Sequence, residues 1–358
     1  MNHKQRVLSV LTAAALLCTG IGTAGVTTPL AANAAESVES SMNWDTLNIG
    51  GGGFVGKYLA EHLMQDRGWE TVVTKLPKET VSVDGCEIYN LDILDQDAVE
   101  ALLIRLRPDV IFHLAAQSSV AYSWKNPQLT VDINIHGSLN VLEAIRAIED
   151  YQPKVLLIGS GEEYGVLPKG LSLVSETTPV QPGNPYAITK AAQNLFGTLY
   201  AKSYDMDITM VRAFNHIGPG QAPQFVVSDF CKQAAEIAAG MREPVMRVGN
   251  LSAVRDFTDV RDVMRAYSLL ALHGKAGETY NVGSGRAISI QEILERIIRL
   301  SGVAITVEVD PAKLRPVEVP VIQADIAKLQ ADTGWMPEIP LEQTIRETLD
   351  YWRSTAEN

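Results

Sequence analysis

Short apolar runs alternate along the chain with longer stretches in which apolar residues recur at helical spacing. Amphipathic stretches such as 96–105 separate runs of strand length, which lie at 47–49, 70–74, 86–89, 109–112 and 155–158. Apolar strands separated by amphipathic helices are typical of a parallel sheet that is covered on both faces. We therefore expect an α/β fold built on a doubly wound parallel sheet.

The pattern changes near residue 214. Helical spacing then dominates, at 226–239, 290–300 and 341–352, with one strand-like run at 305–309. We expect residues 44–214 to form the large sheet domain and residues 215–358 to form a smaller mixed α/β domain. Whether the helical stretch 259–273 returns to the large domain stays open.

A glycine-rich turn follows the first predicted strand. Gly50, Gly53 and Gly56 stand three residues apart, with Phe54 and Val55 between the last two, and a helical pattern begins at Lys57. Glycines let a pyrophosphate approach the backbone, and the start of a helix offers free N–H groups to it. The turn therefore predicts a Rossmann domain that binds NAD or NADP. The strand before the turn is poor in apolar residues for a buried parallel strand.

The end of the second predicted strand bears on the choice of cofactor. Domains that bind NAD usually place Asp or Glu there, whereas this chain has Thr74 and Lys75, with Lys78 nearby. A cation suits the additional phosphate of NADP. We therefore expect NADPH and keep NADH as the alternative.

Polar and small residues stand where the later strands end, at the edge where open parallel sheets bind ligands. Asp92 and Ile93 follow the third strand, and Ser160 ends the fifth. The fourth strand is followed by Leu114, Ala115, Ala116, Gln117 and Ser118.

Tyr186 and Lys190 lie four residues apart behind Pro185, a residue that suits the first turn of a helix. This spacing places both side chains on one helix face. A phenol has a pKa of about 10, and a neighbouring ammonium group lowers it by stabilising the phenolate. The pair, with Ser160 nearby, predicts a proton-transfer site for a carbonyl that gains or loses hydride.

Charge and cysteine content restrict the partners and the compartment. The 358 residues include 30 basic and 42 acidic side chains, and the formal net charge of −12 disfavours nucleic acid and anionic membranes. Cys18, Cys86 and Cys231 lack metal-ligand spacing, so we expect no metal and a reducing compartment. In contrast, residues 1–35 are typical of a secretory signal peptide. An extension without a role in export is the alternative.

Together these motifs resemble the extended short-chain dehydrogenases/reductases of the NAD-dependent epimerase/dehydratase family, which act on nucleotide sugars. The residues that carry the resemblance are the glycine turn, Leu114-Ala115-Ala116, Asn134, Ser160 with Tyr164, and Tyr186 with Lys190. The resemblance implies that Ser160 holds the substrate oxygen and that Tyr186 transfers its proton. It also implies that Lys190 binds the nicotinamide ribose and that Asp92 and Ile93 lie against the adenine.

The carboxyl half resembles the branch of that family that reduces GDP-4-keto sugars, through the motifs at 212–221, 248–262 and 314–320. The implied activity is reduction of the C4 keto group of GDP-4-keto-6-deoxy-D-mannose by NAD(P)H to give GDP-D-rhamnose, carried out by a homodimer. Arginine donors suit a diphosphate, and a carboxylate accepts hydrogen bonds from ribose hydroxyls. The substrate-binding residues implied by the resemblance are Gln117, Ser118, Glu162, Asn215, Arg255, Arg315 and Glu318.

Other activities stay open. A GDP-mannose 4,6-dehydratase uses a Glu with a Ser or Asp beside it in the loop after Ser160; here Glu162 follows Gly161, which favours reduction. An epimerase would interconvert GDP-sugars without net consumption of cofactor. An exported, non-catalytic nucleotide-sugar binding protein would account for residues 1–35 but not for an activated phenol. GDP-sugars and NADPH are cytosolic metabolites, which favours the cytoplasm.

Overall fold

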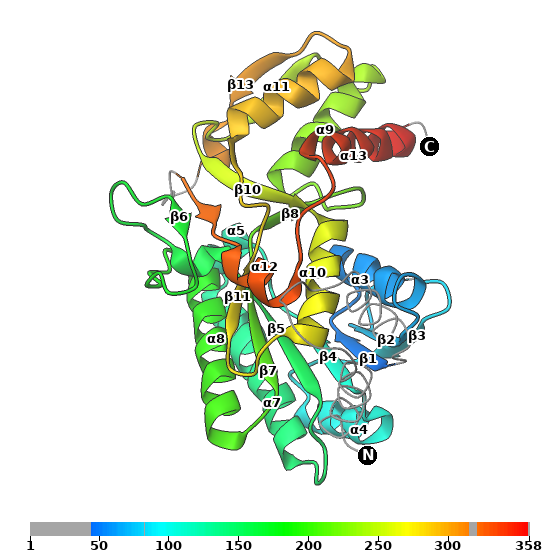
Figure 1. Cartoon of the computed structure of the whole chain (residues 1–358). Coiled ribbons are helices and arrows are strands. Elements are labelled where there is room, and N and C mark those ends of the chain that lie inside the picture. Colours follow the sequence, from blue (N-terminus) through cyan, green and yellow to red (C-terminus); the bar gives the residue numbers. More distant parts are fainter. Residues whose placement is uncertain (1–43, 82, 315–320, 357–358) are drawn as a thin grey trace, which may run out of the picture.

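A parallel sheet of seven strands forms the centre of the molecule, as the computed structural model shows for the described residues 44–81, 83–314 and 321–356 (Figure 1). Its strand order is β11-β7-β5-β4-β1-β2-β3, and all neighbours in it run parallel. The strands are β1 (Asp45–Ile49), β2 (Glu70–Lys75), β3 (Glu87–Asn90), β4 (Val110–His113), β5 (Lys154–Ser160), β7 (Ile208–Ala213) and β11 (Thr279–Val282). The chain winds outward from β1 in both directions, so the expected doubly wound α/β fold is confirmed.

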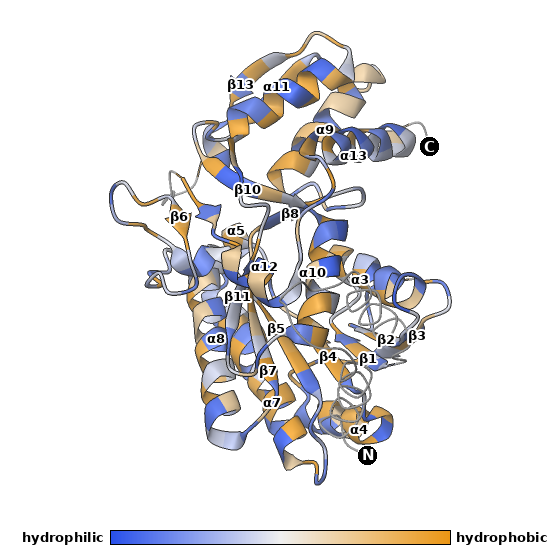
Figure 2. Cartoon of the chain, viewed as in Figure 1, coloured by the Kyte–Doolittle hydropathy of each residue, from blue (hydrophilic) through white to orange (hydrophobic). Residues whose placement is uncertain are grey.

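Helices cover both faces of this sheet, and the strands between them are largely apolar (Figure 2). On one face, α3 (Phe54–Gln65) packs against α10 (Val260–His273), near α12 (Ala327–Thr333). The other face carries α4 (Gln96–Leu106), α7 (Gly137–Ala147) and α8 (Pro185–Tyr204). The helices and the sheet enclose two apolar cores, one on each face of the sheet. Their burial is the main stabilising contribution to a fold of this kind.

Strand β1 contains an unusual polar residue. Leu47 and Ile49 fill the apolar core, whereas Asn48 is completely buried and its side-chain amide has no hydrogen-bond partner among the described residues. A buried polar group without a partner costs about 1–3 kcal/mol. The polar residue that makes this strand poor in apolar residues therefore lowers the stability of the folded protein.

The predicted smaller domain contributes a separate set of elements, the first of which follows β7 in the chain. Its apolar core lies between helices α9 (Val226–Ala238), α11 (Ile290–Ser301) and α13 (Leu341–Ala356). Its strands are β8 (Asn215–Ile217), β9 (Val245–Val248), β10 (Val254–Asp259), β12 (Ala287–Ser289) and β13 (Thr306–Val309). A separate pair is formed by β6 (Leu173–Val174) and β14 (Gln323–Ala324).

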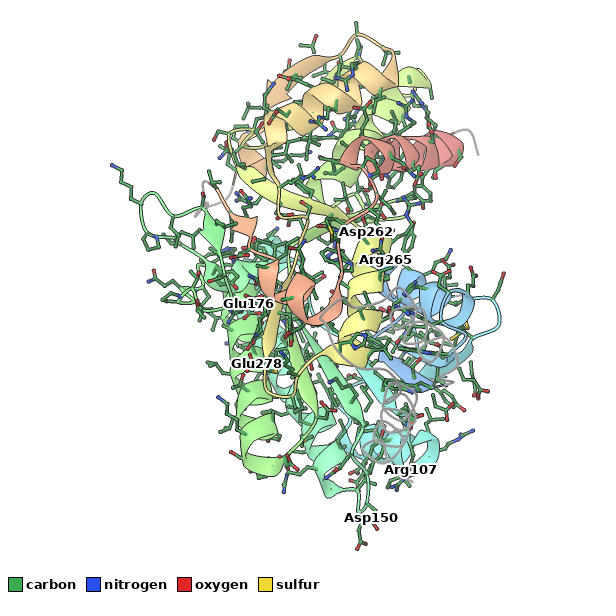
Figure 3. The ribbon with its side chains drawn as sticks, in the orientation of Figure 1. Arg107, Asp150, Glu176, Asp262, Arg265 and Glu278 are labelled. Carbon is green, nitrogen blue, oxygen red and sulfur yellow. The ribbon has the colours of Figure 1, made fainter. Side chains whose placement is uncertain are left out.

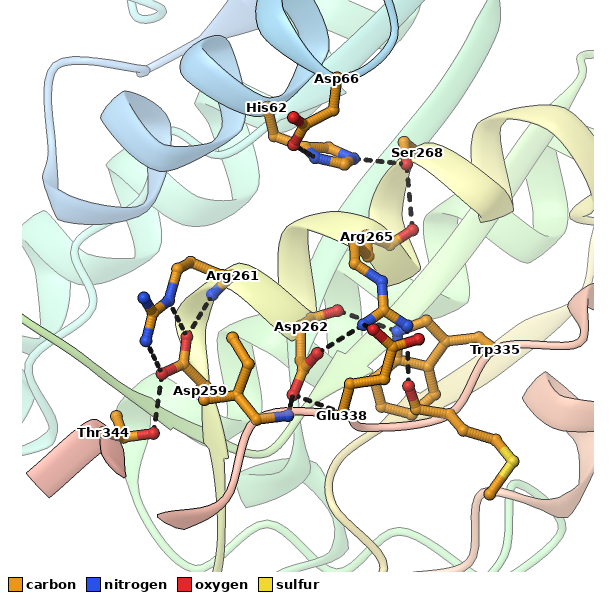
Figure 4. A network of polar contacts seen from close by, with 12 residues as sticks. His62, Asp66, Asp259, Arg261, Asp262, Arg265, Ser268, Trp335, Glu338 and Thr344 are labelled. Atoms are coloured by element: carbon orange, nitrogen blue, oxygen red, sulfur yellow. Dashed lines mark hydrogen bonds and ion pairs between the residues drawn. The ribbon is translucent and has the colours of Figure 1, made fainter. Parts of the chain in front are cut away.

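A polar network fixes helix α10 where the two parts of the chain meet (Figure 4). Asp262 accepts hydrogen bonds from the backbone N–H groups of Glu338 (3.0 Å) and Ile339 (2.9 Å), and its carbonyl accepts one from Trp335 Nε1 (2.9 Å). The stretch 260–273 itself packs against the large sheet. The next strand in the chain, β11, then joins that sheet by pairing with β7. The division of the chain at residues 214 and 215 stays a prediction.

Figure 3 labels Arg107 and Asp150 at the end of the molecule that lies away from α9, α11 and α13. There, Arg107 Nη2 donates to the carbonyl of Asp150 (2.8 Å). Across residues 44–81, 83–314 and 321–356, no helix is long and apolar enough to cross a membrane. No cluster of three or more His, Cys, Asp or Glu that could hold a metal ion occurs in those same ranges. The predicted signal peptide, residues 1–35, lies outside them.

Candidate active site

The glycine turn brings β1 into close contact with the end of β4. Gly50 has φ +78°, and a Cβ atom on it would lie 2.4 Å from the Cα atom of Ala115. Only glycine fits such a conformation and such an approach. The N–H groups of Leu114 and Ala115 donate to the carbonyl of Ile49 at 2.9 and 2.8 Å, so the loop after β4 is held against the turn.

The amino terminus of α3 is open to an anion. Its first turn has no side-chain cap, and a Cβ atom on Gly53 would meet no heavy atom within 4 Å. Phe54 stacks on His216 with 6.4 Å between the ring centres, and Val55 packs beside it on the apolar core. Free N–H groups above an open glycine suit the pyrophosphate of a dinucleotide, so these residues fit the expected cofactor.

The other residues predicted to bind the cofactor lie at the same edge of the sheet. Thr74 is buried, and its hydroxyl accepts a hydrogen bond from the N–H of Gly50 at 3.0 Å, so it supports the turn. Lys75 Nζ donates to Asn90 Oδ1 at 3.0 Å. Ile93 is buried, while Asp92 is exposed and its carboxylate accepts from the N–H of Leu94.

Asn134 connects the loop after β4 to helix α8. It is completely buried within a π-helical turn (Asp132–His136), a feature that often occurs at functional sites. Its side chain accepts from the N–H of Gln117 (2.8 Å) and donates to the carbonyl of Gln117 (3.1 Å) and to Thr189 Oγ1 (2.9 Å). Ala116 and Ser118 flank that contact in the chain, and Ser118 is exposed.

The predicted reaction centre is assembled from β5 and α8. Asn184 caps α8 by accepting from the N–H of Ala187 (2.8 Å), which places Tyr186 in the first turn. The side chain of Ser160 interacts with the hydroxyl of Tyr186, and both residues are buried. One turn later, Lys190 Nζ donates to the carbonyl of Ile158 (2.7 Å) and to Gln193 Oε1 (3.0 Å). The structure thus brings together the three residues predicted to be catalytic.

The electrostatics of these groups differ from the sequence-based expectation. Burial raises the pKa of Tyr186, and Glu162 and Glu163 raise it further, whereas the hydrogen bond from Ser160 lowers it. Lys190 points to the carbonyl of Ile158 and does not produce the expected lowering of the tyrosine pKa. Burial itself lowers the pKa of Lys190 to about 8, against the opposing effect of Glu163. Tyr186 is therefore a neutral phenol at pH 7, the form that donates a proton.

A buried ion pair below the reaction centre was not foreseen from the sequence. Glu163 is completely buried; it accepts from the N–H of Ser160 (2.9 Å) through one oxygen and from Arg212 Nε (2.9 Å) through the other. Burial raises the pKa of Glu163 to about 7, although Arg212 acts in the opposite direction. Two adjacent glutamates in the sequence gave no signal that one of them is buried.

Comparison with known proteins identifies the family. The family model described as GDP-mannose 4,6 dehydratase matches residues 47–348. The chain belongs to this family. It is 34% identical over 302 residues to the GDP-6-deoxy-D-mannose reductase of Pseudomonas aeruginosa, an alignment that covers 84% of this chain and 95% of that protein. The resemblance seen in the motifs is thereby confirmed.

Two solved structures share the fold of this chain. RMD from Pseudomonas aeruginosa, complexed with NADPH, has a TM-score of 0.77 and 32% identity, over 87% of this chain and 99% of that one. UDP-glucose 4-epimerase of Thermus thermophilus, complexed with NAD, has a TM-score of 0.76 and 32% identity, over 86% and 98%. Proteins of this fold therefore hold either dinucleotide.

The structure describes some, but not all, of the residues that were predicted to bind the substrate. Glu162 adjoins the reaction centre, and its Oε2 accepts from Asn184 Nδ2 at 3.1 Å. Asn215 is exposed on β8, and Arg255 lies on β10 with Nη1 donating to the carbonyl of Val254 (3.0 Å). The predictions for Arg315 and Glu318 fall outside the described residues.

The buried ammonium group yields a prediction for stability. A shift of the Lys190 pKa from 10.5 to about 8 costs the folded state about 3 kcal/mol at pH 7. Lys190→Met removes this cost but also two hydrogen bonds, so we expect a net gain of about 1–2 kcal/mol in the free energy of unfolding at pH 7. Because the folded-state pKa is the lower one, the cost is full below pH 8 and disappears as the pH approaches 10.5.

Urea unfolding of both proteins at pH 7, 9 and 10.5 measures this effect. The exposed Lys202→Met in the same helix is the matched control, and we expect it to show no pH-dependent gain. A Lys190→Met protein that is less stable than the wild type at pH 7 would contradict the prediction.

Proposed function

We propose that the chain is a GDP-4-keto-6-deoxy-D-mannose reductase that forms GDP-D-rhamnose, also named GDP-6-deoxy-D-mannose. The proposal is supported by the similarity to a GDP-6-deoxy-D-mannose reductase over most of both chains. It is also supported by the Ser160, Tyr186 and Lys190 arrangement at the carboxyl ends of the strands. When bound, NADPH or NADH supplies the hydride.

The observation that favours reduction over dehydration is the packing behind Gly161. A Cβ atom on Gly161 would lie 3.1 Å from Cγ of the buried Phe214 ring, a tight contact that requires the ring to shift by a few tenths of an ångström. Gly161 provides neither the acid nor the hydroxyl that a dehydratase places beside its Glu, and Phe214 backs the position where such a side chain would stand. Glu162 instead holds Asn184, the residue that caps α8.

The reaction requires one hydride at C4 and one proton at O4. Tyr186 is protonated at neutral pH and can donate that proton as negative charge develops on O4. The serine hydroxyl interacts with Tyr186, so it can hold the same substrate oxygen by a hydrogen bond. Lys190, one helical turn away, is charged below pH 8 and can donate hydrogen bonds to the nicotinamide ribose of the bound cofactor.

The direct test is the absorbance of reduced nicotinamide when the full chain is given NADPH, or NADH in a parallel series, and freshly made GDP-4-keto-6-deoxy-D-mannose. We expect substrate-dependent loss of the band and formation of a 6-deoxy GDP-sugar. GDP-mannose supplied without a reduced cofactor should give no product. Product from GDP-mannose alone would indicate a dehydratase, and interconversion of GDP-sugars without net cofactor use would indicate an epimerase.

Tyr186→Phe removes the proton donor and keeps the ring. General-acid catalysis contributes about 10² to 10⁴ in rate, so we expect kcat to fall by that order while dinucleotide binding is retained. Tyr200→Phe, in the same helix with its hydroxyl on Glu143, is the matched control and should retain activity. Near-normal turnover of Tyr186→Phe would remove Tyr186 from the proposed role.

We also propose that the chain acts as a homodimer. Helix α8 exposes an apolar stripe with helical spacing, and the short helices α5 (Val120–Lys125) and α6 (Pro127–Val131) contact α8 and add to it. Exposed apolar side chains gathered on neighbouring helices are typical of an interaction face. The exposed apolar side chains are Trp124, Leu129, Val131, Ile188, Leu195 and Leu199.

Leu195→Asp combined with Leu199→Asp places two charges on this stripe, where they would be desolvated in an interface. We expect the wild-type chain to have the mass of a dimer in light scattering and the double variant that of a monomer, with unchanged circular dichroism. Met241→Asp, an equally exposed apolar residue in the smaller part, is the control and should stay dimeric. A dimeric double variant would place the interface elsewhere.

We propose that the active protein works in the cytoplasm, because its proposed substrate and cofactor are cytosolic metabolites. Residues 1–35 still favour export as the alternative. Cell fractionation of the full chain, followed by the reductase assay, separates the two: activity confined to the secreted fraction would contradict the cytoplasmic proposal.

A further inference from the structure

An acidic side chain lies at the carboxyl end of β2, although no acid follows that strand directly in the sequence. After β2 ends at Lys75, the chain turns back on itself. The N–H of Glu79 donates to the carbonyl of Leu76 (3.0 Å), and the N–H of Leu76 donates to Glu79 Oε2 (2.8 Å). The carboxylate is thus held by the backbone at the end of the strand.

The same carboxylate also adjoins the glycine turn. A Cβ atom on Gly52 would lie 2.7 Å from Glu79 Oε2 and 3.0 Å from Lys75 Cβ. Glu79 therefore stands between the turn that fits the pyrophosphate and the end of the second strand. In dinucleotide folds this is where the ribose of the adenosine half lies, with its 2′-hydroxyl on an acidic residue or its 2′-phosphate on a cation.

The lysines that suggested a phosphate site are arranged differently. Lys75 Nζ donates to Asn90 Oδ1 on the neighbouring strand β3 and, at 3.4 Å, to the carbonyl of Leu76. Lys78 is exposed in the turn. A carboxylate only accepts hydrogen bonds, which suits two ribose hydroxyls, whereas a phosphate carrying nearly two negative charges beside it is repelled.

We infer that Glu79 sets the cofactor preference of this chain by accepting hydrogen bonds from the adenosine ribose and opposing the 2′-phosphate of NADPH. The chain then binds NADH at least as tightly as NADPH. This inference rests on the proposed function only in assuming that the chain binds a nicotinamide dinucleotide. The preference between NADH and NADPH can be measured without any sugar substrate.

The test is calorimetric titration of the full chain with NADH and with NADPH, without GDP-sugar. For the wild type we expect a dissociation constant for NADH equal to or below that for NADPH. Glu79→Gln keeps the size of the side chain and removes its charge, so we expect NADPH to bind about tenfold more tightly and NADH about threefold more weakly. Asp84→Asn, an exposed acid in the same loop, is the control for long-range charge and should leave the ratio of the two constants unchanged.

Two results would overturn the inference. One is a wild type that prefers NADPH tenfold or more with the same ratio in Glu79→Gln. The other is a wild-type preference that reverses in Lys75→Gln or Lys78→Gln but not in Glu79→Gln, since the lysines would then be the discriminating residues. Binding of neither dinucleotide would instead remove the proposed reductase, so the two failures are distinguishable.

Discussion

The buried ion pair between Glu163 and Arg212 couples the reaction centre to the sheet. One carboxylate oxygen fixes the N–H of Ser160 at the end of β5, and the guanidinium group of Arg212 comes from β7. Arg212 also donates to the hydroxyl of Tyr164, which in turn donates to Asn281 on β11. Breaking a buried pair by removing one partner typically costs about 3–5 kcal/mol, because it leaves the other charge buried. Ser160 is thus positioned by the loop that follows it, and the side chains of that loop are in turn fixed by β7 and β11.

The same burial that fixes this geometry controls the protonation states. Exclusion of water raises the pKa of the phenol and of the Glu163 carboxyl, and it lowers the pKa of Lys190. A neutral phenol suits a reduction, since the oxygen formed at C4 must receive a proton. The folded chain bears a cost in stability for this arrangement, which is common where catalytic groups are kept from water.

Much of the site could be predicted because its residues follow local rules. Glycine spacing after a strand, small residues at strand ends and a Tyr-Lys pair at helical spacing each depend on a few adjacent positions, and the structure brings all three features to one edge of the sheet. Glu79 and Glu163 could not be found in this way. One owes its position to a turn that folds back, and the other to a guanidinium 49 residues away. The expectation of NADPH from Thr74 and Lys75 used sequence adjacency, and adjacency alone could not show that Glu79 also adjoins Gly52.

The family to which this chain belongs carries the name of a dehydratase, and its solved neighbours include an epimerase and a protein holding NADPH. Because one fold carries all these activities, the difference has to arise in the side chains and loops above the sheet. In the loop after β5, the ring of Phe214 backs Gly161, and Asn184 engages the carboxylate of Glu162. Gly161 leaves the proposed reductase without a side chain beside Glu162 that could act as the second acid of an elimination. Because Phe214 lies close behind Gly161, a side chain introduced there would need the ring to move.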